Sequence, residues 1–325
     1  YNNRLRIVIK ARSLMTVLVT GGCGFIGSHL VDALLKAGHT VRVVDDLSTG
    51  TREAVAPSVE VVVADVADES TFAPLLDGVD AVFHLAAIAS VEASQKAWSR
   101  SHQVNSGGLV NLLQHIKQSG RVIPVVYASS AAVYGDCHAS PIDESVVPAP
   151  LSAYGADKLA CESHGRIASR LHGIPTLGLR FFNVFGPGQN PASPYSGVIS
   201  LFMDKAARGE TLTILGDGEQ TRDFVFVGDV VRAMLDGLGA LQSGQLGGEV
   251  FNVGGGHAIT IHQLAQAICD IYGLDAKGQI AYGPAREGEI RHSLSDISRL
   301  KAALNWQPKW SLADGLNAIR HNEAA

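Results

Sequence analysis

Five short apolar runs alternate with longer amphipathic segments through the first half of the chain. Apolar runs of this length are typical of parallel strands that are buried on both faces, while the segments between them place their apolar residues at helical spacing. Strands and helices in alternation predict an α/β fold built on a doubly wound parallel sheet. The expected strands are residues 16–20, 41–45, 59–65, 80–87 and 122–130, and the expected helices between them include 25–37 and 102–118.

A glycine-rich stretch, TGGCGFIG, follows the first expected strand and opens the first expected helix. Its glycines Gly21, Gly24 and Gly27 let the backbone turn tightly, approach a pyrophosphate and pack the helix closely on the strand. The next strand ends at Asp45, with Asp46 beside it, where a carboxylate can accept the ribose hydroxyls of adenosine and repel a 2′-phosphate. We therefore expect a Rossmann-type dinucleotide site that binds NAD rather than NADP.

The character of the sequence changes near residue 185, where GPGQNPASPYSG brings Pro, Gly and Ser together and the strand–helix alternation stops. We expect an N-terminal extension over residues 1–14, an NAD-binding Rossmann domain over 15–184 and a smaller C-terminal substrate-binding lobe over 185–325, some segments of which return to the first domain. The elements expected after residue 185 are the helices 198–208, 229–241, 260–272 and 311–322 and the strands 224–227 and 249–253.

Charge and cysteine content exclude several other classes of protein. The 26 Lys and Arg and 31 Asp and Glu give a formal net charge of −5 without a block of like charge, so neither nucleic acid nor a membrane surface is an expected partner. The four cysteines lie far apart, without the spacing of zinc ligands or of a disulfide framework, and no metal site is expected. No run approaches the roughly 20 apolar residues of a membrane span. We expect a soluble, cytoplasmic protein.

With its GxxGxxG spacing, the chain from Met15 onward resembles the extended short-chain dehydrogenase/reductase family. The resemblance implies that Asp65 and Val66, after the third strand, contact adenine, that HLAA at 84–87 lines the cofactor groove, and that Asn105 lies on the helix beside the cofactor. The implied cofactor-binding residues are Gly21, Gly24, Phe25, Ile26, Gly27, Asp45, Asp46, Asp65, Val66, Leu85, Ala86, Ala87, Asn105, Tyr154 and Lys158.

Tyr154 and Lys158 form a YxxxK motif, four residues apart and therefore on one face of a helix expected to run to about residue 171. A free tyrosine has a pKa of about 10, so a neighbouring ammonium that favours the phenolate makes it a better base near neutral pH. Ser130 stands where the family keeps its catalytic Ser or Thr. The resemblance implies that Tyr154 takes a hydroxyl proton while hydride leaves the same carbon for the nicotinamide, and that Ser130 hydrogen-bonds the reacting oxygen.

The residues after Ser130 bear on the fate of the oxidised sugar. Dehydratases of this family carry an Asp-Glu pair directly after the catalytic Ser or Thr, and here those positions hold Ala131 and Ala132. Without an acid and a base there, elimination lacks its machinery, and the simplest outcome is return of the hydride to the opposite face of the keto sugar. SSAAVYG is also similar to the corresponding stretch of nucleotide-sugar 4-epimerases. The expected activity is that of an isomerase, an NAD-dependent 4-epimerase of UDP-hexoses.

Segments of the second half resemble those that bind the nucleotide sugar in such epimerases. RFFNVFGP supplies Asn183 and DGEQTRDFVFVGD supplies Arg222, both expected on the diphosphate, and REGEIRHSLSD supplies Arg286 in a comparable role. Arginine suits a diphosphate because its planar guanidinium holds phosphate oxygens bidentately. The expected substrate-binding residues are Ser90, Val91, Ser130, Asn183, Arg222, Asn252, Arg286, Glu289 and Ser293.

Ser293 bears on the choice of sugar. In the family the matching residue gates the 2-substituent: a bulky Tyr confines the enzyme to glucose and galactose, whereas a small residue admits an N-acetyl group. Ser293 thus implies interconversion of UDP-GlcNAc and UDP-GalNAc alongside UDP-glucose and UDP-galactose. The volume of a residue excludes more reliably than it selects, so the preference between the two pairs stays open, as does the nucleotide base, UDP or dTDP.

The resemblance also implies a homodimer held by a four-helix bundle, to which the helices 102–118 and 154–171 would contribute. Two alternatives remain. One is another nucleotide-sugar enzyme on this scaffold: a UDP-glucuronate 4-epimerase, a decarboxylase or a keto-sugar reductase using free NAD(P)H. The other is a non-catalytic NAD-binding regulatory protein, against which the intact set of Ser130, Tyr154 and Lys158 argues.

Overall fold

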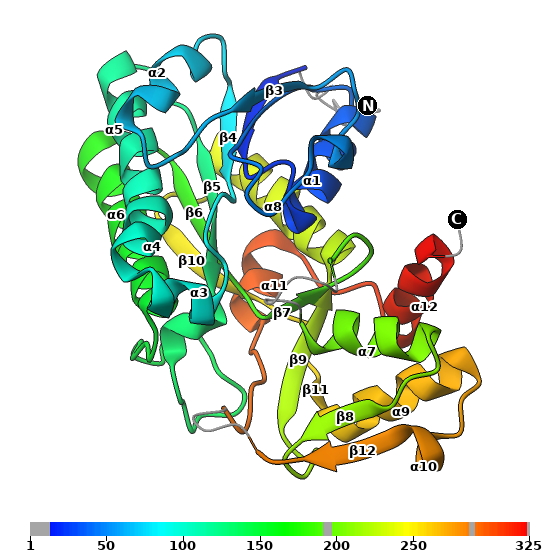
Figure 1. Cartoon of the computed structure of the whole chain (residues 1–325). Coiled ribbons are helices and arrows are strands. Elements are labelled where there is room, and N and C mark those ends of the chain that lie inside the picture. Colours follow the sequence, from blue (N-terminus) through cyan, green and yellow to red (C-terminus); the bar gives the residue numbers. More distant parts are fainter. Residues whose placement is uncertain (1–13, 191–196, 286–289, 324–325) are drawn as a thin grey trace, which may run out of the picture.

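A wholly parallel seven-stranded sheet forms the centre of the computed structural model, which describes residues 14–190, 197–285 and 290–323 (Figure 1). The strands lie in the order β10-β6-β5-β4-β1-β2-β3. Their bounds are β1 (Thr16–Thr20), β2 (Thr40–Asp45), β3 (Glu60–Val63), β4 (Ala81–His84), β5 (Val125–Ser130), β6 (Thr176–Phe181) and β10 (Glu249–Val253). The predicted doubly wound parallel sheet is confirmed.

Three of the predicted strands are shorter than expected. β4 ends at His84 rather than at residue 87, because the hydroxyl of Thr20 accepts the N–H groups of Leu85 and Ala86 and draws the chain out of the sheet. β3 covers only Glu60–Val63, and β5 begins at Val125, directly after a proline that has no N–H for the ladder. The apolar run that forms β6 was not predicted as a strand.

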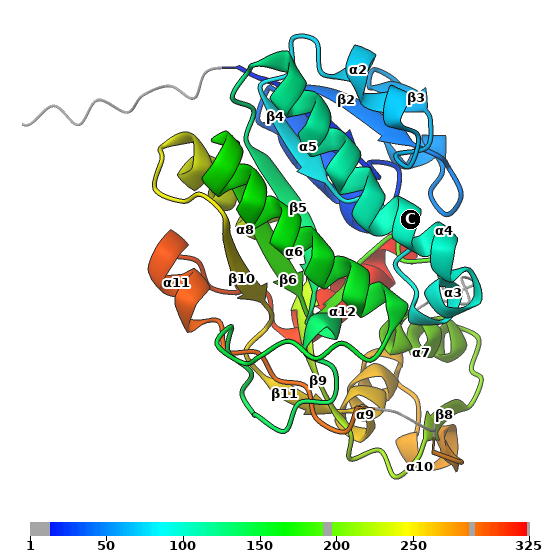
Figure 2. The same cartoon turned by 90° about the vertical axis from the view of Figure 1, so that its left-hand side faces the viewer.

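Helices cover both faces of this sheet. On one face α1 (Phe25–Lys36) and α8 (Val227–Gln242) share an apolar core with it, and on the other α5 (Gly108–Ser119) and α6 (Ala153–His172) do so. Figure 2 shows α5 and α6 lying side by side across the sheet. Helix α8 was expected among the elements of the C-terminal lobe. It packs on the main sheet beside α1 instead, because its apolar residues are buried in the core that α1 and the sheet share.

The expected helix at 102–118 is longer and less regular than predicted. It starts as α4 (Trp98–His102), passes through the π-helical turn η3 (Gln103–Gly107) and continues as α5 to Gly120, whose left-handed conformation ends it. The other short helices are η1 (Arg52–Ala54), η2 (Glu69–Thr71), α2 (Phe72–Leu75), α3 (Val91–Lys96), η4 (Ala131–Tyr134), α10 (Ala276–Gln279) and α11 (Ser298–Leu304).

A smaller lobe lies below the carboxyl ends of the sheet strands in Figure 1. It contains the three-stranded sheet β11-β9-β7 and the parallel pair β12-β8, which pack with α7, α9 and α12 around an apolar core of their own. The bounds are β7 (Asn183–Phe185), β8 (Leu212–Leu215), β9 (Thr221–Phe226), β11 (Ala258–Thr260), β12 (Ile280–Gly283), α7 (Val198–Ala207), α9 (Ile261–Tyr272) and α12 (Leu312–Glu323). Since β10 and α8 join the main sheet, the chain crosses between the two parts more than once. The boundaries at 14/15 and 184/185 stay predictions.

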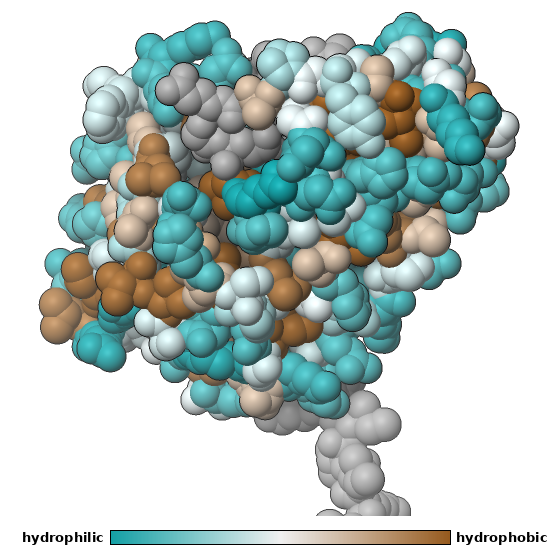
Figure 3. Space-filling model, turned by 90° about the horizontal axis from the view of Figure 1, so that it is seen from below, coloured by the Kyte–Doolittle hydropathy of each residue, from teal (hydrophilic) through white to brown (hydrophobic). Residues whose placement is uncertain are grey.

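Apolar side chains are exposed along the outer side of α4, α5 and α6. Trp98 is 68% exposed, Val110 36%, Ile167 46% and Leu171 73%. Seen from below, apolar surface also gathers on the left of the molecule, where α4 and α6 lie in Figure 1 (Figure 3). Within residues 14–190, 197–285 and 290–323, no helix has the length and apolar character needed to cross a membrane, and no His, Cys, Asp and Glu side chains group as metal ligands.

Candidate active site

The glycine loop between β1 and α1 leaves space only for hydrogen at two of its positions. Gly21 has a positive φ of +69°, and a Cβ there would lie 2.7 Å from the Ala86 nitrogen. A Cβ on Gly27 would lie 2.0 Å from the Gly21 carbonyl oxygen. The loop therefore packs against the HLAA segment on one side and against the helix on the other, as the predicted roles of these glycines require.

Gly24 has room where the other two have none. A Cβ there would meet nothing closer than the Gly21 oxygen at 3.4 Å, and Gly24 caps α1 in an extended conformation without a side-chain hydrogen bond. The first N–H groups of α1, among them those of Phe25 and Ile26, have no intrahelical partner, and no acid lies in this first turn. An open glycine before uncapped N–H groups fits the pyrophosphate of a dinucleotide.

The glycine loop and the first turn of α1 form a cradle, and Asp45 lies on its other side. Its carboxylate is buried and accepts the backbone N–H of Cys23 and of Leu47, each at 2.9 Å, one on each oxygen. Both oxygens keep lone pairs for a ribose hydroxyl. Asp46 is exposed, and its Oδ1 accepts the N–H and hydroxyl of Ser48, so it stabilises its own turn. The two neighbouring acids thus differ in place, and Asp45 faces the glycine loop.

The two residues expected around adenine, Asp65 and Val66, also differ in their exposure. Asp65 accepts the Ala67 N–H at 2.9 Å and pairs with Arg100 at 2.6 Å, and it stays partly exposed. The side chain of Val66 is buried and packs on Gly108, where a Cβ would lie 2.8 Å from Val66 Cγ2, and its contact with adenine stays a prediction.

Asn105 is fully buried in the π-helical turn η3. Its side-chain oxygen accepts the Ile88 N–H at 2.7 Å, and its amide nitrogen donates to the Ile88 oxygen at 3.2 Å and to Ser101 Oγ at 3.0 Å. Asn105 therefore fixes the loop that continues from Leu85, Ala86 and Ala87, which is how it can shape the cofactor groove.

Ser130, Tyr154 and Lys158 meet where β5 ends against the start of α6. Lys158 is 2% exposed, its Nζ donates to the Ala128 oxygen at 2.9 Å and lies 5.8 Å from the centre of the Tyr154 ring. Ser130 Oγ accepts the N–H of Ala132 at 3.1 Å, so its own proton remains available to a further acceptor. This arrangement places a cation beside the phenol and a hydroxyl donor at the adjoining strand end.

Ser94 ties Tyr154 to the neighbouring helix. Its Oγ accepts the Tyr154 N–H at 3.2 Å and donates to the Val91 oxygen at 2.7 Å. Ser90 caps α3 by accepting the Ala93 N–H at 3.0 Å, and Val91 is 44% exposed. The predicted pair Ser90 and Val91 thus lies on the element that packs against the Tyr154 end of α6.

His84, at the end of β4, is a buried neutral imidazole. Burial, and to a smaller extent the charge of Lys158, lowers the pKa of His84 to about 3. Thr20 Oγ1 lies 3.0 Å from His84 Nδ1 and already accepts two N–H groups, so its proton goes to Nδ1. His84 Nε2 is buried without a hydrogen-bond partner among the described residues.

The predicted diphosphate ligands Asn183 and Arg222 lie on two strands of the three-stranded sheet of the lobe. Ser130 pairs with Phe181 in the sheet, and two residues later Asn183 starts β7, where it is exposed. Arg222 lies on β9, which pairs with β7, and its guanidinium donates to the Ile290 oxygen at 2.8 Å. Asn183 therefore lies two residues beyond the partner of Ser130, and Arg222 lies on the strand that pairs with β7.

Ser293 is half-buried on the segment 290–296, which lies between β9 and residue 142. The segment is held by Asp223, whose carboxylate accepts the N–H of Ser295 at 2.8 Å and the Ser295 hydroxyl, and by the Thr221 N–H, which donates to the Arg291 oxygen at 2.9 Å. Ser293 thus lies on the segment that Arg222 contacts, three residues after Ile290. Arg286 and Glu289 lie outside the described residues.

Asn252 occupies a different environment from the other predicted substrate residues. It is fully buried; its amide nitrogen donates to the oxygens of Ile142 at 2.9 Å and Asp296 at 3.2 Å, and its oxygen accepts the Tyr134 hydroxyl at 2.7 Å. Its amide is therefore occupied by the protein, and its role toward a substrate stays a prediction.

A buried ion pair between Glu162 and Arg180, behind the end of β5, was not predicted. The signal that could have found it is the arginine within the otherwise apolar run TLGLRF at 176–181, because a buried charge needs a partner.

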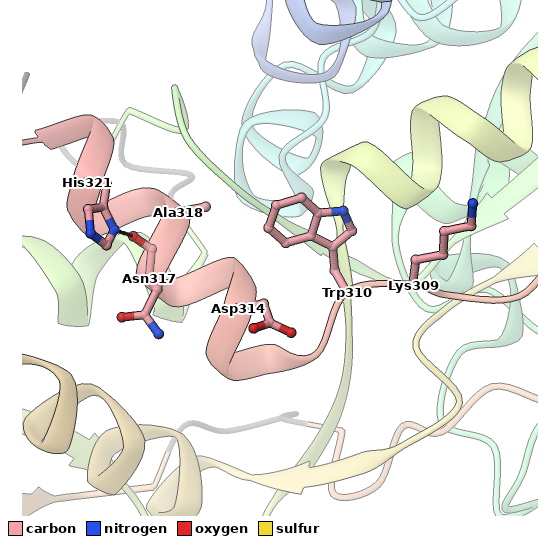
Figure 4. A pocket seen from close by; sticks show the side chains of 6 residues that line it. All are labelled: Lys309, Trp310, Asp314, Asn317, Ala318 and His321. Carbon is pink, nitrogen blue, oxygen red and sulfur yellow. Dashed lines mark hydrogen bonds between the residues drawn. The ribbon is translucent and has the colours of Figure 1, made fainter.

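A separate hollow of about 540 Å³ lies along α12 (Figure 4). Trp310 stacks on Phe226 there, with ring centres 4.2 Å apart. None of the predicted site residues lines this hollow, which is therefore distinct from the candidate active site. Its lining residues are Lys309, Trp310, Asp314, Asn317, Ala318 and His321.

Known proteins share this fold and sequence over nearly the whole chain. The UDP-glucose 4-epimerase of Mycolicibacterium smegmatis is 37% identical over 93% of this chain and 96% of its own. The crystal structure of UDP-glucose 4-epimerase with UDP-glucose from Thermotoga maritima has a TM-score of 0.89 at 36% identity, covering 95% of this chain and 99% of that one. UDP-N-acetylglucosamine 4-epimerase from Methanobrevibacter ruminantium, in complex with UDP-N-acetylmuramic acid, has a TM-score of 0.87 at 35% identity, covering 95% and 99%.

Relatives with another reaction also occur. The UDP-N-acetyl-alpha-D-glucosaminuronate decarboxylase of Bacillus cytotoxicus is 31% identical over 92% of this chain and 94% of its own. The family model that matches the chain, over residues 17–254, is described as "NAD dependent epimerase/dehydratase family". The chain belongs to this NAD dependent epimerase/dehydratase family, which confirms both the resemblance expected from its motifs and NAD as the expected cofactor.

Proposed function

We propose that the protein is an NAD-dependent 4-epimerase of UDP-hexoses that works through a 4-keto intermediate. The observation that carries the proposal is the meeting of Ser130, Tyr154 and Lys158 beside the glycine cradle, with a buried lysine held at the Ala128 oxygen next to the phenol. Two alanines follow Ser130, where a dehydratase would need its acid and base.

Ser130, Tyr154 and Lys158 form a catalytic triad in which each residue has one role. Bound NAD would supply the hydride acceptor, and later the hydride donor, for C4 of the sugar. Tyr154 removes the proton of the 4-hydroxyl, and Lys158 places its ammonium beside the Tyr154 ring, with Nζ 5.8 Å from the ring centre. Ser130 donates a hydrogen bond to the same oxygen and stabilises the charge that develops there. On return, Tyr154 gives the proton back.

Residues of the smaller lobe bind the diphosphate of the nucleotide. Asn183 and Arg222 lie on paired strands, so together they can contact a diphosphate whose sugar reaches Ser130. The named activities of the UDP-sugar relatives support uridine as the base.

We propose that UDP-GlcNAc and UDP-GalNAc are substrates as well as UDP-glucose and UDP-galactose. Ser293 is small and half-buried on the segment beside Arg222, which leaves volume for a 2-acetamido group. The likeness to the UDP-N-acetylglucosamine 4-epimerase of Methanobrevibacter ruminantium supports this wider range.

We also propose a homodimer through the outer sides of α5 and α6. Val110, Ile167 and Leu171 are exposed there although they are apolar, and Trp98 extends this surface along α4. Burying such side chains against a second copy removes them from water.

A UDP-sugar decarboxylase is the second candidate, because the Bacillus cytotoxicus relative has that name. It would release carbon dioxide from a uronic acid, whereas an epimerase converts a neutral hexose without change of mass.

Replacement of Tyr154 by Phe tests the proposal. Losing the general base should lower turnover of UDP-galactose by about 10²- to 10⁴-fold, while NAD content stays as in the wild type. The matched control is Tyr282→Phe, which removes an exposed hydroxyl that contacts His262. Turnover near the wild-type rate in Tyr154→Phe would contradict the assignment.

A further inference from the structure

A chain of buried polar groups begins directly beside Ser130. Ser129 Oγ donates to Glu162 Oε1 at 2.6 Å, and Glu162 accepts two bonds from Arg180, from Nε at 2.8 Å and from a terminal nitrogen at 2.6 Å. Glu162 is 2% exposed and Arg180 5%. Such a pair is costly to bury unless every partner is in place, so these side chains have well-defined positions.

Tyr134 continues the chain from the arginine. The other terminal nitrogen of Arg180 donates to the Tyr134 hydroxyl at 2.8 Å, and the guanidinium lies over the Tyr134 ring at 4.7 Å. The hydroxyl donates in turn to Asn252 Oδ1 at 2.7 Å. Burial raises the pKa of the Tyr134 hydroxyl, which therefore keeps the proton that it donates.

Asn252 connects the chain to the segment that carries Ser293. Its amide nitrogen holds the oxygens of Ile142 and Asp296, and residues 142 and 295 form a β-bridge. One run of hydrogen bonds thus joins the strand end beside Ser130 to the segment 290–296 on the opposite side of the site.

Tyr134 and Ser130 are the two ends of one structural unit. Ser130 caps the single turn η4 by accepting the Ala132 N–H, and Tyr134 is the last residue of that turn. The Ala132 oxygen packs on Gly155, where a Cβ would lie only 2.5 Å away, directly after Tyr154. A shift of this turn therefore changes the position of Ser130 relative to Tyr154.

We propose that Tyr134 is a positioning residue for the reaction: its hydroxyl, held between Arg180 and Asn252, fixes the turn η4 so that Ser130 faces the reacting oxygen. The hydroxyl acts through Ser130 and does not touch substrate. The catalytic part of this inference rests on the proposed function.

Tyr134→Phe removes the hydroxyl and leaves the ring packed near Phe182, with ring centres 6.5 Å apart. We expect turnover of UDP-galactose to fall about 10- to 100-fold while KM changes less than about threefold, because a misplaced donor weakens transition-state contacts more than substrate binding. In the free protein, the amides of residues 131–135 should exchange with deuterium about tenfold faster. The matched control is Tyr127→Phe, which alters a buried tyrosine of the preceding strand β5 whose hydroxyl lies between Gly165 and Gly178. It should change neither quantity.

A double-mutant cycle separates positioning from general destabilisation. In a Ser130→Ala background, Tyr134→Phe should cost little further turnover, because the group that it positions is gone. Additive losses, or unchanged exchange at 131–135, would overturn the proposal. If the wild-type protein itself fails to epimerise UDP-galactose, the proposed function fails, and the exchange rates decide alone whether Tyr134 fixes the turn.

Discussion

The cofactor cradle and the substrate side of the site are built in different ways. The cradle is formed between Thr16 and Asp45 by one strand, one loop, one helix and the end of the next strand. The proposed substrate side combines Asn183, Arg222 and Ser293 from segments far apart in the chain, and long-range hydrogen bonds hold these segments. The first depends on local backbone geometry, and the second depends on the packing of the lobe.

This difference predicts which substitutions each of the two regions should tolerate. In the cradle, the space at Gly21 and Gly27 is set by backbone atoms, which cannot give way. On the substrate side, the segment 290–296 is held by several side chains at once, among them Asp223 and Arg222, so its surface can vary while its path is kept. Cofactor binding should therefore be lost through single glycine changes, whereas substrate range should shift gradually.

The largest effect is expected when the cradle is broken. In Gly27→Ala, the new Cβ would need to lie 2.0 Å from the Gly21 oxygen, so the loop must move away from α1. We expect the purified variant to lose its bound NAD, measured by release and absorbance of the nucleotide. Gly278→Ala, where a Cβ meets nothing closer than 3.8 Å, is the control and should keep NAD. Wild-type NAD content in Gly27→Ala would contradict the role given to these backbone contacts.

A smaller and selective effect is expected on the substrate side. Ser293→Tyr should slow UDP-GalNAc conversion by at least about tenfold and leave UDP-galactose within about threefold, because the added ring takes the volume of the acetamido group. The measurement is kcat/KM for both sugars. Ser298→Tyr, at the exposed start of α11, serves as the control. Equal losses on the two substrates would refute the gate.

The smallest effect concerns His84, which lies next to the cradle. Its pKa of about 3 in the folded protein is below the value of about 6.5 expected when unfolded, so below pH 6.5 the unfolded chain binds a proton that the folded one does not. Protonation of the unfolded chain therefore lowers the free energy of unfolding as pH falls from 6.5 toward 3, by up to about 1.4 kcal/mol per pH unit. Above pH 6.5 this loss is absent.

Denaturant unfolding between pH 7.5 and 5 measures this slope. It should be shallower in His84→Gln than in the wild type and unchanged in His172→Gln, which alters an exposed histidine at the end of α6. Equal slopes in all three proteins would show that His84 does not contribute to the pH dependence of stability.

The sequence predicts most where local pattern decides the structure. Strands β1 to β5 of the central sheet followed from their apolar runs, because strands buried on both faces need them, whereas β6 was not predicted. The spacing of Gly21, Gly24 and Gly27 fits the cradle that the structure shows, and Tyr154 and Lys158 lie together on α6 as four-residue spacing requires.

Long-range packing is what the sequence does not reveal. The period of α8 predicts a helix but not its partner, and it packs on the main sheet beside α1 rather than in the lobe. Asn252 was expected among the substrate-binding residues, which stays a prediction; the pairing of β10 with β6 puts it beside Arg180, inside a buried hydrogen-bond network. Neither placement can be derived from neighbouring residues.

The central claim, proton removal by Tyr154 with hydride taken from C4 and returned to C4, is tested most directly with UDP-galactose carrying deuterium at C4. The purified protein, without added cofactor, should convert it to UDP-glucose with the deuterium still at C4, and Tyr154→Phe should not. Loss of the label to solvent, or no conversion even when NAD is supplied, would contradict the account.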